Sequence, residues 1–249
     1  MVEKYTAYIY FGDKICYNKI KVVIFLIYIT GDTHIPCDIS KINSNRFPAS
    51  KELSKSDFLI ICGDFGGVWN NDNEELYWRK WLENKKFTTL FVDGNHENFN
   101  LLNEFEIVDF CKGKAHKISN SIYHLMRGQI YEIDGKRIFT FGGASSHDKE
   151  YRTKDKNWWE EELPSENELK FAQKNLENVD WKVDYIVTHC APTSIQHNIS
   201  SKYQPDRLTD FFETIKANAS YRTWYFGHYH TDRTIENQFC CLFNNINQI

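Results

Sequence analysis

The sequence predicts an α/β protein with mixed sheets that are parallel in the parts carrying its polar motifs. Three observations predict this fold class. Short apolar runs rich in Ile, Val, Phe and Tyr end abruptly at polar clusters, helical patterns lie between several of them, and one stretch alternates about a turn signal. The chain has 249 residues, of which 41% are hydrophobic, so it can form one large domain, or two small ones, with a substantial core.

The first 21 residues alternate weakly and have no obvious partner. We expect residues 1–21 to be an N-terminal extension of unknown role, followed by a domain over residues 22–249. The most apolar run, residues 22–30, follows several lysines and resembles a signal peptide. It is too short to cross a bilayer and leads into GDTH rather than a small-residue cleavage site, so we interpret it as a buried strand.

Five near-continuous apolar runs predict strands that are buried on both faces: IFLIYIT, DFLII, TTLFV, DYIVT and RTWYF. Apolar residues at helical spacing predict helices over residues 71–85, 164–178 and 203–217. Alternation on both sides of Asp134 and Gly135 predicts a β-hairpin.

Each of the five apolar runs is followed directly by a polar cluster. In open α/β sheets, ligands bind beyond the carboxyl ends of the strands, so these loops could converge on one cleft. Several glycines directly precede the polar residues, where they permit sharp turns and close packing. The loops deliver these candidate site residues: Asp32, His34, Asp64, Asn95, His96, His189, His228 and His230.

Imidazole and carboxylate groups together favour the divalent transition metals Mn, Fe, Co, Ni or Zn, and we expect Mn. Seven potential ligands exceed what one ion needs, so two ions sharing a carboxylate is the natural arrangement. Such ions lie roughly 3.5–4 Å apart and clamp the attacking and leaving oxygens of an in-line displacement. Because Asp32 and Asp64 carry only two negative charges, the loaded site would attract phosphate and acidify a bridging water.

In their order along the chain, the motifs GDTH, GDFGG, GNHE, THCAP and GHYH resemble those of the calcineurin-like metallophosphoesterase superfamily, from about residue 27 onward. The resemblance implies a four-layer α/β/β/α sandwich of two mixed sheets flanked by helices. It also implies hydrolysis of phosphate mono- or diesters by a metal-bridging hydroxide. By the same likeness, one metal would be held by Asp32, His34 and His230, a second by Asn95, His189 and His228, and both by Asp64.

The resemblance makes His96 the residue that contacts the substrate phosphate or protonates the leaving oxygen. Many phosphatases of the superfamily read GDxxDR at the second motif, whereas this chain reads GDFGGVW, with Gly67 and Val68 in place of Asp and Arg. This departure argues against the protein-serine/threonine-phosphatase branch. The sequence resembles a smaller bacterial and phage-type branch with GDFGG and a later GGASS.D stretch. Arg152, near that stretch, is a candidate substrate-binding cation.

Other residues have less specific signals. Trp69 is a candidate for shaping the cleft. Trp158 and Trp159 could stack a base, but we expect them to cover a hydrophobic edge. We expect Glu97 to favour the N-terminus of a short helix. The remaining histidines are expected to be solvated or half-buried: His116, His124 and His197.

We therefore expect a phosphoesterase that acts on a small phosphate ester or a nucleotide, with the missing second-motif arginine favouring diesters or nucleotides. Seven cysteines without framework spacing indicate a reducing compartment, so we expect a cytoplasmic protein without a membrane segment. A non-catalytic scaffold of the same fold is an alternative that the intact ligand set opposes. A nuclease is another, but a net charge of −4 disfavours nucleic acid as a partner. The oligomeric state is left open.

Overall fold

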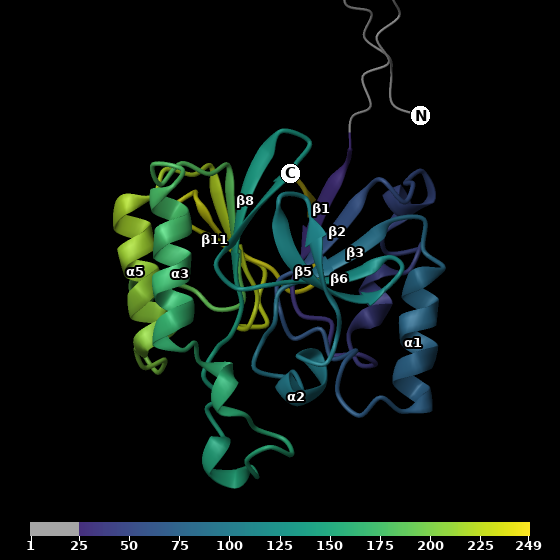
Figure 1. Ribbon diagram of the computed structural model, residues 1–249, viewed down its shortest axis with the longest axis horizontal. Coiled ribbons are helices and arrows are strands. Elements are labelled where there is room, and N and C mark those ends of the chain that lie inside the picture. The colour runs from purple at the N-terminus through teal and green to yellow at the C-terminus, as the bar shows by residue number, and fades with distance from the viewer. Residues whose placement is uncertain (1–24) are drawn as a thin grey trace, which may run out of the picture.

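The structure, a computed structural model, describes residues 25–249. The predicted N-terminal extension, residues 1–21, lies outside the described residues. Two mixed sheets pack face to face, and helices cover their outer faces, with α3 and α5 on one side and α1 on the other (Figure 1). The predicted four-layer α/β/β/α sandwich is confirmed.

The first sheet has seven strands in the order β13-β1-β2-β3-β6-β5-β4. Its central strands β1, β2, β3 and β6 pair in parallel. Antiparallel pairing adds β13 on one side and β5 and then β4 on the other. The apolar runs that predicted β1, β2 and β3 are buried almost throughout. The strand bounds are β1 Ile27–Thr30, β2 Phe58–Ile61, β3 Thr88–Phe91, β4 Ile107–Phe110, β5 Gly113–Ser119, β6 Ile122–Leu125 and β13 Ile246–Gln248.

The second sheet has six strands in the order β11-β12-β10-β9-β8-β7. Strands β12, β10, β9 and β8 are parallel, and β11 and β7 are antiparallel edges. The predicted hairpin joins β7 to β8, and both turn residues have positive φ, 51° at Asp134 and 71° at Gly135. The bounds are β7 Gln129–Ile133, β8 Lys136–Phe141, β9 Tyr185–Thr188, β10 Thr223–Phe226, β11 Arg233–Ile235 and β12 Phe239–Cys241.

The three predicted helices are confirmed, with ends that differ by a few residues. Asp72 caps α1, while Ser165 and Asp206 begin α3 and α5 with capping boxes. The α-helices are α1 Asn73–Glu83, α2 Phe99–Leu102, α3 Glu166–Glu177, α4 Thr193–Ile199 and α5 Arg207–Asn218. Four 3₁₀ turns accompany them: η1 Ile39–Ile42, η2 Pro48–Lys51, η3 Lys149–Tyr151 and η4 Glu160–Glu162.

Alternation along the strands divides the core into three layers. On β1, Ile27 and Ile29 point into the layer between the sheets, whereas Tyr28 joins the layer beneath α1. The third layer packs α3, α4 and α5 against the second sheet. Within residues 25–249, no helix is long and apolar enough to cross a bilayer. The parallel strands bring their carboxyl ends to one edge of the sandwich, which positions the loops described next.

Candidate metal centre

The structure brings the eight residues predicted for the site together, in a continuous chain of contacts between the loops. Asp32 and His34 follow β1, Asp64 follows β2, and Asn95 and His96 follow β3, all in the first sheet. His189 follows β9, and His228 and His230 follow β10, in the second sheet. The site therefore spans the ends of both sheets.

Four of these residues form a tight group, which we call the metal-capable group: Asp32, His34, Asp64 and His230. Their possible ligand atoms all lie within 4.8 Å of one another. Nε2 of His34 is 3.1 Å from Oδ2 of Asp64, and Nε2 of His230 is 3.2 Å from Oδ2 of Asp32. The two carboxylates are buried, whereas the His230 side chain is 54% exposed and stacks on the Phe243 ring. One side of the group is thus open to solvent.

Asn95, His189 and His228 lie beside this group rather than within it. Nε2 of His189 is 3.2 Å from Oδ1 of Asn95 and 3.3 Å from Oδ1 of Asp64. The His228 ring packs edge-on against His189, with centroids 5.0 Å apart. Nδ1 of His189 is 2.8 Å from the Cys62 carbonyl oxygen, so it donates there, and in the neutral ring Nε2 carries the lone pair that faces the site.

The electrostatics of the site favour a cation. Burial opposes a charge on His189, but the carboxylates of Asp64 and Asp32 raise its pKa to about 10. Burial also opposes a charge on His34, but the carboxylates of Asp64, Asp32 and Asp38 together outweigh it, so the pKa of His34 is raised. Imidazoles that gain protons despite burial mark a negative potential, which a metal ion would satisfy in place of those protons. Imidazole, carboxylate and amide donors at these separations fit divalent transition metals.

The backbone bends sharply at four of these residues. His34, Asp64, His228 and His230 have φ of 33°, 45°, 67° and 46°, in the left-handed region that side chains rarely adopt. Such a conformation costs on the order of 1–3 kcal/mol per residue and tends to occur where function requires it. Two of these turns occur in one loop, at His228 and His230, and both side chains reach the gathered site residues.

Two glycines allow backbone to approach the buried carboxylates. A Cβ on Gly94 would lie 2.0 Å from Oδ1 of Asp64, and one on Gly227 would lie 2.0 Å from Oδ1 of Asp32. A nearby backbone N–H donates to each carboxylate: that of His96, two residues after Gly94, to Asp64 at 2.8 Å, and that of His228, directly after Gly227, to Asp32 at 3.0 Å. The glycines therefore fix the carboxylates through their neighbours.

His96 is half-buried, with its ring centroid 5.6 Å from that of His34, and its side chain has no hydrogen bond to any residue from 25 to 249. Gly67 packs against the Phe65 ring, and Val68 is 1% exposed, so both positions that depart from GDxxDR are apolar. The structure thus supplies no substitute for the missing partner there.

Arg152 lies outside the gathered residues but close enough to affect His96. Burial lowers the pKa of His96, Asp64 opposes this, and the Arg152 charge lowers it further. Nε of Arg152 is 2.7 Å from Oδ1 of Asp148, and Nη1 donates to the Asn157 carbonyl at 3.2 Å. The guanidinium is thereby tethered near His96 rather than bound to the carboxylates.

The expectation for Glu97 is wrong. It is fully buried, and its Oε1 accepts the N–H of Phe65 at 2.7 Å, while Asn98 caps α2 instead. Burial raises the pKa of Glu97 well above its usual value, and Oε2 has no hydrogen-bond partner among the described residues. Glu97 is therefore a buried support beneath the loop that carries Asp64.

A buried ionic network behind the GNHE loop was not predicted. Arg127 donates to Oδ2 of Asp93 from Nε at 2.9 Å and Nη2 at 2.6 Å, and Nε2 of His124 is 3.1 Å from Oδ1. His116 packs on His124, with Nδ1 atoms 2.9 Å apart. Both histidines are buried, contrary to expectation, whereas His197 is exposed as expected. The only sequence signal is that Asp93 precedes the motif.

Buried carboxylates and imidazoles gathered at the strand ends of a two-sheet sandwich define the class of metal-dependent phosphoesterases. A family model described as calcineurin-like phosphoesterase matches residues 25–232, and the chain belongs to that family. The chain is also similar to lariat debranching enzyme A of Xenopus laevis, with 26% identity over 189 residues. That match covers 67% of this chain but 33% of the relative, so the chain spans about a third of the relative's length.

Proposed function

We propose that the protein hydrolyses phosphate esters with two divalent transition-metal ions, and that manganese is the preferred metal. The observation that carries this proposal is the approach of the possible ligand atoms of Asp32, His34, Asp64 and His230 to within 4.8 Å of one another. Membership of the phosphoesterase family supports it. The six cysteines of residues 25–249 are all free, which agrees with a reducing, cytoplasmic location.

In this proposal the predicted ligand sets are kept. Asp32, His34 and His230 would hold one ion, Asn95, His189 and His228 would hold the other, and Asp64 would be shared. When bound, the two ions would acidify a water between them and draw charge from the phosphoryl oxygens.

The surroundings of His96 support an acid–base role in this proposal. His96 is half-buried beside His34, and the backbone bond to Asp64 holds its loop while its side chain has no protein partner. We assign it the contact with the phosphate or the proton transfer to the leaving oxygen. Arg152, tethered nearby by Asp148, would add a positive charge for the phosphate.

We favour phosphodiesters or nucleotides over simple monoesters as substrates, because the position of the missing arginine, Val68, is buried and apolar. The name of the relative, lariat debranching enzyme A, is compatible with this choice. The test is turnover of bis-p-nitrophenyl phosphate against p-nitrophenyl phosphate after chelation and return of manganese. Faster cleavage of the diester is expected. Failure on both, in a chain that also stays free of metal, would instead support the scaffold alternative.

A further inference from the structure

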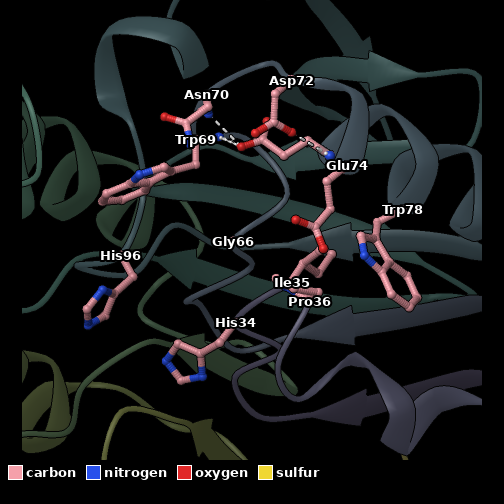
Figure 2. Close-up of a pocket in the computed structure, with 11 residues that line it drawn as sticks. His34, Ile35, Pro36, Gly66, Trp69, Asn70, Asp72, Glu74, Trp78 and His96 are labelled. Carbon is pink, nitrogen blue, oxygen red and sulfur yellow. Dashed lines mark hydrogen bonds between the residues drawn. The ribbon is translucent and has the colours of Figure 1, made fainter.

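A cavity of about 320 Å³ lies next to the metal-capable group (Figure 2). We call it the side pocket. The lining residues that matter here are His34, His96, Trp69, Trp78, Glu74 and Asp72. His34 belongs to the metal-capable group and His96 lies beside it, so the pocket and the candidate metal centre are continuous. A phosphate held at the centre would direct one of its ester substituents into this space.

Two tryptophans border the side pocket from opposite sides in Figure 2, Trp69 on the side of His96 and Trp78 on the side of α1. Trp69 is fixed edge-on by the buried Trp159, with centroids 5.2 Å apart. Trp78 is fixed in the same way by Trp81, at 5.5 Å. The expectations that Trp69 shapes the cleft and that Trp159 covers a hydrophobic edge agree with this packing. The pocket therefore offers two held indole rings to a ligand.

The wall away from the metal-capable group is acidic. Among residues 25–249, no lysine or arginine lines the side pocket. Glu75 is already satisfied, because it accepts the N–H groups of Trp69, Asn70 and Asn71 and pairs with Arg79. Glu74 differs from it: within residues 25–249 its carboxylate has no hydrogen bond or ion pair, and Figure 2 shows it pointing into the pocket toward Ile35 and Pro36.

Glu74 and Trp78 are one turn apart on α1, at positions i and i+4, so both can contact the same ligand group. A carboxylate beside an indole face is a combination that binds an organic cation, through charge attraction and the cation–π interaction. A second phosphate or a carboxylate in this position would be repelled by Glu74 and Asp72. A nucleobase would direct some of its acceptor atoms at the same carboxylates.

We propose that the side pocket binds one organic substituent of the phosphate ester and selects a compact apolar group that carries a positive charge, such as an ammonium group. This inference rests on the proposed function and specifies its substrate class. The phosphate lies at the metal-capable group, the substituent lies between Trp69 and Trp78, and its charge lies against Glu74.

The test uses three diesters that release the same p-nitrophenolate and differ in the second substituent. These are p-nitrophenyl phosphorylcholine, its uncharged carbon isostere with a 3,3-dimethylbutyl group, and the negatively charged ester of 4-hydroxybutanoate. The manganese-loaded protein should show the highest kcat/KM for the choline ester and the lowest for the anionic ester. Equal kcat/KM for the choline ester and its isostere would overturn the proposal.

Glu74→Gln should reduce the preference for the choline ester over its isostere by about tenfold, because it removes the charge but keeps the size. The matched control is Glu166→Gln, which removes an exposed first-turn carboxylate from α3 and should leave the preference unchanged. Trp78→Phe should also weaken the preference, with Trp181→Phe as its control, since Trp181 packs against the core of the second sheet and does not line the pocket. An unchanged preference in Glu74→Gln would contradict the assignment.

Bis-p-nitrophenyl phosphate and a binding measurement separate the two proposals. If none of the esters is hydrolysed, the proposed function fails, but the side pocket is still tested by titrating metal-free protein with choline and following tryptophan fluorescence. Saturable quenching that weakens in Glu74→Gln, and that 3,3-dimethylbutanol does not reproduce, supports the side pocket alone. Hydrolysis of bis-p-nitrophenyl phosphate without any choline preference supports the function and overturns the side pocket.

Discussion

The backbone N–H of His96 donates a hydrogen bond of 2.8 Å to Oδ1 of Asp64. This bond joins the loop after β2 to the loop after β3. The carboxylate proposed to be shared by two ions therefore also fixes the loop of the residue proposed for acid–base chemistry. Asp64 thus takes part in two proposed functions, metal binding and the placement of His96, and these can be tested separately.

Asp64→Asn should weaken the binding of both ions by at least about tenfold, because the shared anion is lost. An asparagine oxygen can still accept the His96 N–H, so the fold should persist. Elemental analysis after equilibration with limiting manganese measures the effect, and Asp109→Asn, at an exposed position on β4, serves as the control. Two ions bound at full occupancy in Asp64→Asn would contradict the shared role.

His96→Ala should retain its metal and lose turnover by about 10²–10⁴-fold, the usual contribution of an acid–base residue. The measurements are metal content and kcat on bis-p-nitrophenyl phosphate. His197→Ala, at an exposed histidine on α4, should change neither. Loss of metal together with activity would identify His96 as a ligand or a structural residue instead.

Glu162→Gln should stabilise the protein at pH 8 but not at pH 5. Oε2 of Glu162 accepts the N–H of Ser146, and burial raises the Glu162 pKa to about 7. Between the unfolded value of about 4.5 and pH 7, the folded state binds more protons than the unfolded state, so stability falls as pH rises. The gain at pH 8 should be roughly 1–3 kcal/mol. Urea unfolding at both pH values measures this gain. An equal effect at pH 5 and pH 8 would contradict the raised pKa of Glu162.

Arg127→Met should destabilise the protein by about 3–5 kcal/mol, because it leaves the buried Asp93 carboxylate without its cation. Arg127 and Asp93 are both almost fully buried and share two hydrogen bonds. Adding Asp93→Asn should recover part of that loss, which a double-mutant cycle by urea unfolding would measure. Additive effects of the two substitutions would show that the pair is not coupled.

Much of the fold could be predicted because its signals are local. The run before GDTH is buried on both faces, as expected of a central parallel strand. Ser165 and Glu168 form the capping box that marks the start of α3. The short strands β11, β12 and β13, each of three residues, carry too little periodicity to be recognised.

The gathering of the site residues could be anticipated because strand ends meet at one edge of a sheet. The buried residues that support the site from behind could not be predicted. Asp93 and Arg127 are 34 positions apart, and no local pattern pairs them. Glu97 has an ordinary sequence context, and only the packing around it reveals that it is buried and that its pKa is raised. Long-range contacts of this kind leave no periodic trace in the chain.

At His34, His228 and His230 the main chain adopts positive φ angles that glycine and asparagine tolerate better. Selection for stability alone would favour glycine or asparagine at these positions, and each such substitution would remove an imidazole. Stability and the proposed metal binding therefore favour different residues at these three positions. A library sorted only for heat resistance should become enriched in stable variants that lack the proposed metal ligands.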